Sequence, residues 1–288
     1  MDSRQLRHFL HLADTLHFGR AAEISHLSPS ALSRAIRQLE NEVGVSLFNR
    51  DNRSVALTSE GQSFLGYARD TLAEWDDMRT RLQSDAGELS GQVSMYCSVT
   101  ASYSFLFELL DRFRHNYPRI EIKLHTGDPE EALARVSSGK EDIAIGARPE
   151  RLPTQLAFKP IAVSPLVFIQ SAATHASGGR IDWPDTPMIL SETGLARARV
   201  DAWFRKRRLA PNIYAQVAGN EAIVSMVSLG FGVGVVPQIV LDNSPLAKKV
   251  VVLDVKPALA PYEVGLFAIN KRLGSPLINA FWSQLKAI

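Results

Sequence analysis

Residues 18–40 read FGRAAEISHLSPSALSRAIRQLE, and this stretch decides the fold of the first part of the chain. Ser28 can accept hydrogen bonds from free backbone amides and Pro29 is tolerated in a first turn, so a helix is predicted to start there. A short helix over 18–25 precedes it, which predicts a helix-turn-helix. The apolar side chains of the later helix recur every three or four residues and predict one buried stripe: Leu32, Ile36, Leu39 and Val43.

The flanking segments complete a winged helix-turn-helix. A first helix is predicted over 3–15, and two short apolar stretches around the polar residues 50–53 predict a hairpin. Thr58 can cap a long fourth helix. Its apolar side chains repeat by threes and fours, interrupted by Arg79, and predict a coiled-coil-like dimerisation seam made of Leu65, Ala68, Leu72, Trp75 and Leu82.

The polar face of the third predicted helix carries residue types that read DNA. Early residues of such a helix face base edges in the major groove, which makes Ser30, Ser33 and Arg34 candidate readers. Arg34 suits a bidentate contact with guanine, and Pro29 suits an apolar contact with a thymine methyl group. Phosphate contacts are the alternative for Arg37 and the serines, and a solvated polar face is the other interpretation.

The hairpin tip and the distribution of charge add to this interpretation. Arg50, Asn52 and Arg53 are candidates for contacts with phosphates or a neighbouring minor groove, the alternative being an ordinary solvated hairpin. The net charge of +2, from 32 basic and 30 acidic residues, is too small to argue for nucleic acid. Every lysine or arginine before Lys123 is an arginine, however, and arginine favours phosphate and guanine contacts.

Composition limits the class of protein. The 288 residues, 45% of them hydrophobic, exceed the ~150 residues of one typical domain, so two domains are expected. Cys97 is the single cysteine, which excludes a disulfide within the chain. The first ten residues lack the apolar core of a signal peptide, and no apolar run approaches the ~18 residues of a membrane span. We therefore expect a soluble, cytoplasmic protein without a membrane partner.

From about residue 90 the pattern changes to strands alternating with helices, so the chain is predicted to be α/β overall. Polar, glycine-containing residues at 85–91 indicate a hinge before this part. The expected division is a DNA-binding domain at 1–58, a linker and dimerisation helix at 59–90, and an α/β domain at 91–288. Strands are predicted at 92–97, 120–125, 142–147, 166–170, 213–217, 233–236 and 263–269.

Polar loops at the ends of predicted strands are candidates for binding a small anion. The loop Ser98, Thr100, Ala101 and Ser102 lies between a strand and a helix start, where free amides and hydroxyls bind carboxylates. Helix capping is the alternative for these hydroxyls and is the preferred interpretation of Asp128 and Asn220. Further candidates are Thr126 and Gly219, at two other strand ends, and Arg197 as a source of positive charge, whereas Arg199 is expected to be solvated.

The segments 18–23, 27–40, 47–50 and 57–61 together resemble the LysR-type family of transcriptional regulators. The resemblance implies a homodimer formed through the fourth helix, assembly to a homotetramer, and binding to an interrupted palindromic operator in double-stranded DNA, with RNA polymerase as a further partner. It carries DNA contacts over onto Ser28, Pro29, Ser30, Ser33, Arg34 and Arg53.

For the C-terminal part the resemblance implies a two-lobed effector domain like a periplasmic binding protein, with the effector between the lobes. Lobe I is expected at about 91–161 and 268–288, and lobe II at about 162–267. The segments 97–104, 122–128 and 220–230 resemble, within this family, an activator of branched-chain amino-acid synthesis. This implies activation of the acetohydroxyacid isomeroreductase gene by a small acidic metabolite, acetolactate or acetohydroxybutyrate, with no other cofactor. A regulator of another pathway with a different acid is the alternative.

Two other classes of protein fit the sequence less well. An enzyme is not expected, because the Gly-x-Ser-x-Gly and phosphate-loop patterns are absent and Gly232-Val-Gly234-Val-Val-Pro237 lacks the third glycine of a dinucleotide fingerprint. His8 and His11 lack neighbouring ligands, so no metal site is predicted. A periplasmic solute-binding protein would share the two-lobed fold, but the winged helix and the missing signal peptide argue against it.

Overall fold

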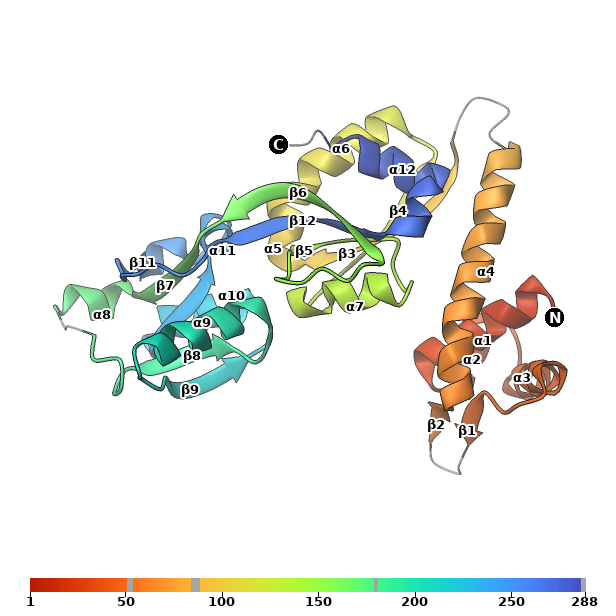
Figure 1. Ribbon diagram of the computed structural model, residues 1–288, viewed down its shortest axis with the longest axis horizontal. Helices are drawn as coiled ribbons and strands as arrows, with labels where there is room; N and C mark the ends of the chain where they lie inside the picture. The colour runs from red at the N-terminus through yellow and green to blue at the C-terminus, as the bar shows by residue number, and fades with distance from the viewer. Residues whose placement is uncertain (51–53, 84–88, 179–180, 286–288) are drawn as a thin grey trace. The chain divides into compact units, whose positions relative to one another are not determined.

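The computed structural model describes residues 1–50, 54–83, 89–178 and 181–285. These residues form two compact units, one N-terminal and one larger and C-terminal (Figure 1). No helix in the described part of the chain is long and apolar enough to cross a membrane.

The N-terminal unit has the predicted winged helix-turn-helix fold. Asp2 caps the first helix by accepting the Gln5 amide at 2.8 Å, and the Gln5 side chain accepts the Asp2 amide at 2.7 Å. Ser28 caps the third helix, which ends at Gly44 with a left-handed φ of 83°. The elements are α1 (Ser3–Thr15), α2 (Phe18–Ile24), α3 (Pro29–Val43), the antiparallel strands β1 (Phe48–Arg50) and β2 (Val55–Leu57), and α4 (Ser59–Gln83).

One face of α4 packs into the core of its own unit. Ala68 (0% exposed) and Leu72 (7% exposed) join buried side chains of α1, α2 and α3, and Leu65 packs against the same cluster. The prediction that Ala68 and Leu72 lie in a dimerisation seam is therefore wrong, since their side chains are already covered within the chain.

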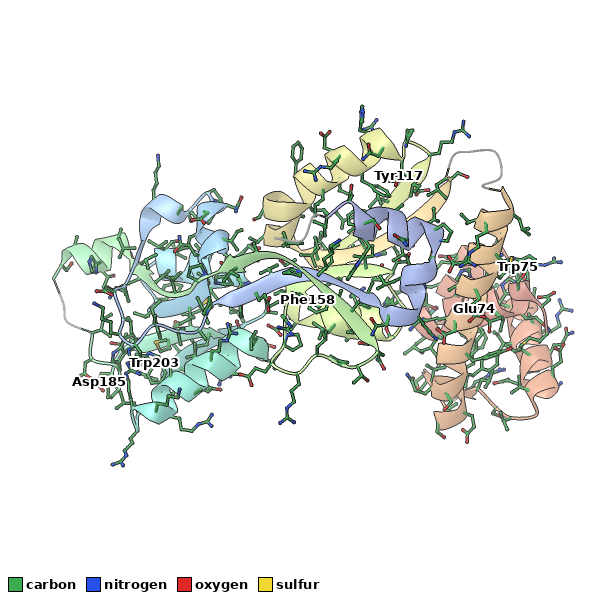
Figure 2. All side chains as sticks on the ribbon, turned by 45° about the horizontal axis from the view of Figure 1, so that its top comes forward. Glu74, Trp75, Tyr117, Phe158, Asp185 and Trp203 are labelled. Atoms are coloured by element: carbon green, nitrogen blue, oxygen red, sulfur yellow. The ribbon has the colours of Figure 1, made fainter. Side chains whose placement is uncertain are left out.

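A second apolar stripe on α4 stays exposed. Trp75, labelled in Figure 2, is 55% exposed and Leu82 is 70% exposed. At ~100° per residue, four exposed apolar side chains fall within roughly 80° of the helix surface. They are Tyr67, Trp75, Met78 and Leu82. We call them the α4 stripe; it retains two residues of the predicted seam and adds two that the sequence pattern did not single out.

The carboxylate of Glu40, near the end of α3, holds the start of the wing. Its Oε1 accepts the backbone N–H groups of Leu47 at 2.9 Å and Phe48 at 3.2 Å, and its Oε2 pairs with Arg50 at 2.5 Å. Arg50 also lies over the ring of Phe18, 5.4 Å from its centroid. Arg50, predicted to contact a phosphate, would share its guanidinium between that phosphate and Glu40.

Lobe I of the C-terminal unit is built on a five-stranded sheet in the order β4-β3-β5-β12-β6. β3 pairs in parallel with β4 and β5, whereas β12 is antiparallel to β5 and β6. The strands are β3 (Gly91–Ser98), β4 (Ile120–Gly127), β5 (Ile143–Ala147), β6 (Leu156–Ser164) and β12 (Tyr262–Ile269). The helices are α5 (Val99–Ala101), the π-helical turn η2 (Ser102–Leu106), α6 (Phe107–Asn116), η3 (Pro129–Glu131), α7 (Ala132–Ser137), η5 (Asn270–Gly274) and α12 (Pro276–Ser283).

Lobe II repeats this plan with a sheet in the order β11-β7-β10-β8-β9. β8 pairs in parallel with β9 and β10, and β7 is antiparallel to β10 and β11. The strands are β7 (Leu166–Ser171), β8 (Pro187–Ser191), β9 (Asn212–Val217), β10 (Val233–Pro237) and β11 (Val250–Val252). The helices are α8 (Ala172–Ala176), α9 (Gly194–Lys206), α10 (Asn220–Ser228), α11 (Gln238–Asp242) and η4 (Ala247–Lys249).

Helices cover both faces of each sheet, so successive residues of a central strand are buried on opposite faces. In lobe I, Tyr96 packs with α7, and Met95 and Cys97 belong to the larger core that includes α6 and α12. In lobe II, Ile189 packs with α10, and Trp203 of α9, labelled in Figure 2, covers the other face. Burial raises the pKa of the Cys97 thiol to about 11.

The chain passes between the lobes along β6 and β12, which run side by side (Figure 1). The two strands pair antiparallel along their whole length, from Tyr262 opposite Ser164 to Ile269 opposite Leu156. The predicted lobe boundaries at 161 and 268 fall inside these strands. They are therefore corrected to the strand ends, beyond Ser164 and before Tyr262, because both strands belong to the sheet of lobe I.

The predicted strands are all present, and three further strands were not predicted. β6 contains Pro160, which argues against a strand by sequence alone and lies beside a register shift in its pairing with β12. β8 begins with Pro187, and β11 has only three residues. Short or proline-containing strands carry too little alternation to be recognised.

We predict that Glu40→Ala destabilises the N-terminal unit by about 2 to 4 kcal/mol, because it leaves two backbone amides and the Arg50 guanidinium without their acceptor. Calorimetric melting of the full chain measures this effect. Glu23→Ala, which removes an exposed acid from α2, is the control and should leave the melting temperature unchanged. Equal melting curves for the two variants would contradict the role given to Glu40.

Candidate functional site

The start of α3 presents the predicted DNA-reading residues on the surface. Ser28, Pro29, Ser30 and Arg34 are exposed, as is Arg37 one turn later. Ser28 accepts the Ala31 amide at 3.2 Å, and its hydroxyl lies 3.1 Å from that of Ser30. Ser33 is half-buried.

The two arginines of α3 differ from the arginine of the wing. Within the described residues, Arg34 and Arg37 have no ion pair, so their guanidinium groups are available to an external anion or base edge. Arg50 is paired with Glu40. Asn52 and Arg53, the other predicted wing contacts, lie outside the described residues.

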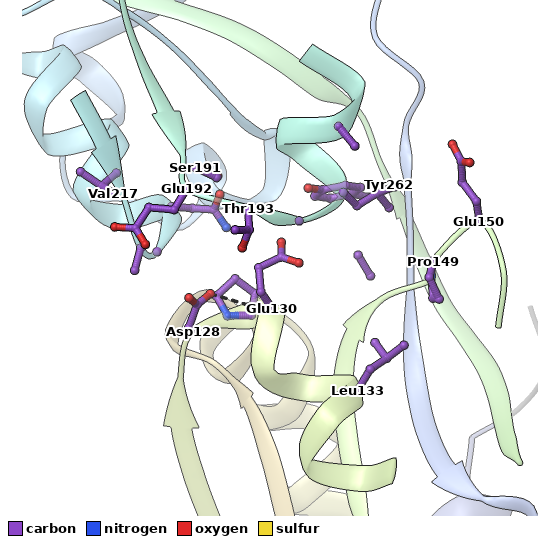
Figure 3. A pocket seen from close by; sticks show the side chains of 18 residues that line it. Asp128, Glu130, Leu133, Pro149, Glu150, Ser191, Glu192, Thr193, Val217 and Tyr262 are labelled. Carbon is purple, nitrogen blue, oxygen red and sulfur yellow. Dashed lines mark hydrogen bonds between the residues drawn. The ribbon is translucent and has the colours of Figure 1, made fainter. Parts of the chain in front are cut away.

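Two neighbouring cavities lie between the lobes of the C-terminal unit. The larger, of about 430 Å³, is shown in Figure 3 and takes residues from both lobes, including Gly219 of the predicted effector set. The smaller, of about 60 Å³, is lined by Ser98, Thr100 and Ala101 of lobe I and by apolar side chains such as Val240 of lobe II. A metabolite of a few carbon atoms fits the larger cavity. The structure thus brings four of the predicted effector residues to one cleft.

The hydroxyl groups of the predicted effector loop already have partners. Ser98 accepts the Ala101 amide at 3.2 Å and so caps α5. Thr100, 6% exposed, donates its amide and its hydroxyl to Glu221 of α10. Ser102 donates to the Val99 carbonyl oxygen at 2.6 Å.

Three predicted effector residues do not line the cleft. Ser102 instead lines an apolar groove between α6 and β4. Thr126 is exposed on β4, opposite Cys97 in the parallel pairing with β3, and belongs to neither cavity lining. Arg197 is held by Asp201 at 3.0 Å and by Gln216 at 2.6 Å. These three predictions are corrected, because a loop position or a charge in the sequence does not fix the direction of its side chain.

Arg199 was expected from the sequence to be solvated, but its guanidinium has partners within the chain. Its guanidinium donates to the carbonyl oxygens of Ala260 at 2.8 Å and Pro261 at 2.6 Å, and it lies over the ring of Tyr262. It therefore holds the chain where it enters β12.

Acidic side chains are the only charged groups among the residues that line the larger cavity. Asp128 and Glu130 of lobe I, Glu192 of lobe II and Glu150 line it, and its lining residues include no lysine, arginine or histidine. Figure 3 shows Glu130 directed toward Thr193, with Glu150 at the other end. Sequence reasoning missed the three glutamates. Their signal was an acid shortly after a strand, in Asp128-Pro-Glu130, Arg148-Pro-Glu150 and Ser191-Glu-Thr193.

Asp128 and Glu130 illustrate how this acidity is organised. Asp128 caps η3 as predicted, accepting the Glu130 amide at 3.0 Å. Desolvation in the cleft and the nearby Asp128 charge raise the pKa of Glu130 to about 7, although the Leu195 amide opposes the shift. The Glu130 carboxyl lies so close to Gly194 that any Cβ there would collide with it.

Within the described residues, no group of three or more His, Cys, Asp or Glu side chains is arranged to hold a metal ion.

We predict that Glu130→Gln stabilises the protein at pH 8 and not at pH 5. A carboxyl whose pKa is raised from 4.5 to about 7 on folding contributes its full stabilisation below its unfolded pKa and loses it as pH rises through 7. Because Glu130 is only partly desolvated in the cleft and solvent still screens its charge, the gain should be under about 1 kcal/mol. Thermal melting of both proteins from pH 5 to 8 measures it; a gain independent of pH would contradict the raised pKa.

Comparison with known families divides the chain as the structure does. A family model described as "Bacterial regulatory helix-turn-helix protein, lysR family" matches residues 3–62. A second, described as "LysR substrate binding domain", matches residues 86–288. The two models therefore cover nearly the whole chain.

Individual proteins resemble the chain along its full length. The HTH-type transcriptional activator IlvY of Salmonella typhimurium is 44% identical over 293 residues, covering 99% of each chain. The HTH-type transcriptional regulator IlvY of Escherichia coli (strain K12) is 43% identical over the same share of both chains. The crystal structure of full-length CbnR complexed with its target DNA shares the fold, with a TM-score of 0.64 at 21% identity over 98% of each chain.

Proposed function

The chain belongs to the LysR family, and we propose that it activates the acetohydroxyacid isomeroreductase gene when acetolactate or acetohydroxybutyrate enters the cleft of its effector domain. It is a DNA-binding transcriptional activator of the IlvY kind. The observation that carries the narrower proposal is the full-length identity of 44% to an IlvY activator, together with a cavity between the lobes that suits a small metabolite.

The proposed DNA surface is the exposed start of α3. Arg34 is placed to read a base edge, and Arg37 one turn later to hold a phosphate. CbnR, which shares the fold, was crystallised with its target DNA. We propose an interrupted palindrome in double-stranded DNA as the operator, bound in the cytoplasm.

We propose that two chains form a dimer through the α4 stripe and that two dimers pair to a homotetramer. Effector binding to this tetramer then changes how the operator DNA is bent and how RNA polymerase is contacted. Exposed Trp and Leu side chains along one helix face favour an apolar interface between chains.

In the proposed effector site, Thr100 binds the carboxylate of the effector. It offers two hydrogen-bond donors, its backbone amide and its hydroxyl. A regulator responding to another small acid is the second candidate, because the cleft donors recognise a carboxylate without selecting one acid.

We predict that Arg34→Ala weakens operator binding by about 1 to 3 kcal/mol and flattens base preference at one position, whereas Arg37→Ala weakens binding to all sequences alike. Gel shifts with operator variants across a salt series separate the two effects. Unchanged preference in Arg34→Ala would remove its role as a reader.

Footprinting of the upstream intergenic DNA, with and without acetolactate, tests the whole proposal. We expect a protected palindrome whose footprint changes with acetolactate. A footprint that does not change with acetolactate would favour a regulator that responds to another small acid. Absence of specific protection would contradict the proposed operator.

Thr100→Ala should weaken acetolactate binding roughly tenfold or more, because one donor to the carboxylate is lost, while operator affinity without acetolactate stays the same. Isothermal titration calorimetry measures the binding. Ser102→Ala is the control, since Ser102 lies in the same loop but outside the cleft. Equal losses in both variants would place the effector elsewhere.

Trp75→Glu should raise the dissociation constant of the dimer at least roughly tenfold by placing a charge in the apolar stripe. Sedimentation equilibrium measures this constant. Gln62→Glu adds the same charge at another exposed position of α4 and should leave the dimer intact. An unchanged dissociation constant of the dimer in Trp75→Glu would contradict the proposed interface.

A further inference from the structure

The contact between Thr100 and Glu221 joins the two lobes across the cleft. Thr100 follows β3 in lobe I, and Glu221 lies in the first turn of α10 in lobe II. The Thr100 amide donates to Glu221 Oε1 at 3.1 Å, and the Thr100 hydroxyl donates to the same oxygen. One carboxylate oxygen of the chain thus takes both donors.

These two donors need an acceptor at all times. An amide in the first turn of a helix has no acceptor within that helix. Thr100 is 6% exposed, so water reaches its polar atoms poorly, and leaving them unpaired would be costly. Any state that removes Glu221 must therefore bring another acceptor to the same place.

The two partners differ in what separation would cost them. Glu221 is exposed and follows Asn220, which lines the cleft, so its carboxylate returns to water when it leaves Thr100. The buried donors stay behind for the incoming group. This asymmetry allows exchange of one carboxylate for another without an unpaired buried charge.

We propose that Glu221 is a built-in competitor of the effector: its carboxylate occupies the donors of Thr100 when the cleft is empty, and the effector's carboxylate displaces it. The identity of the effector rests on the proposed function; the occupation of Thr100 by Glu221 does not. Displacement also replaces a direct tie between the lobes by one that runs through the effector, so binding changes what holds the lobes together.

The competition predicts that removing the Glu221 carboxylate tightens effector binding. Acetolactate affinity, measured by isothermal titration calorimetry on the full-length protein, should rise roughly tenfold in Glu221→Ala and less in Glu221→Gln, whose amide oxygen still accepts hydrogen bonds without a charge. Glu221→Gln also guards against a folding defect of the alanine variant.

Glu192→Gln is the matched control for simple charge repulsion. Glu192 is also an exposed acid of lobe II at the cleft, and within the described residues its side chain has no hydrogen bond to lobe I. Neutralising it should change affinity much less than Glu221→Gln does. Equal gains in Glu192→Gln and Glu221→Gln, or weaker binding in both Glu221 variants, would overturn the competition.

Hydrogen exchange of the Thr100 amide in effector-free protein gives a second readout. We expect faster exchange in Glu221→Ala than in the wild type and no change in Glu192→Gln. If no protein binds acetolactate but this exchange pattern holds, the proposed effector is wrong and the occupation of Thr100 by Glu221 is supported. Unchanged exchange in Glu221→Ala would overturn the inference whatever the effector is.

Discussion

β12 pairs with β5 on one side and with β6 on the other, and both passages of the chain between the lobes leave from this pair. Because backbone hydrogen bonds fix the register of β6 and β12, the two lobes begin from one shared, rigid ribbon. Loops at the strand ends of lobe I then face loops at the strand ends of lobe II, and a cleft is the result. The contact from Thr100 to Glu221 and the approach of Glu130 to Gly194 both depend on this arrangement.

Most of the fold was predictable because it depends on local signals. Ser28 before Pro29, Gly44 after the third helix and the short apolar, buried runs of β3, β5 and β10 each act within a few positions of the chain. Asp128 was correctly assigned as a cap for the same reason. The strand containing Pro160 was missed because its pairing depends on β12, which lies about a hundred positions later in the sequence.

The site was less predictable because side-chain direction and pairing are set by distant residues. α4 carries two apolar stripes, and the spacing of Leu72 and Trp75 alone does not tell which stripe the rest of the chain will cover. A positive charge at Arg197 suggested an anion site, but Asp201 neutralises this charge and Gln216 accepts a further hydrogen bond from the guanidinium. Glu221 could not be paired with Thr100 from sequence, since the partners lie on different lobes.

The buried thiol of Cys97 has a consequence for the cell that carries this regulator. Only the thiolate reacts readily with peroxides and disulfides, and a pKa of about 11 leaves roughly one thiolate in ten thousand molecules at neutral pH. Because its single cysteine is buried in the core of lobe I, the protein exposes no thiol to oxidants. Oxidants in the cell can therefore change this protein readily only through groups other than a thiol.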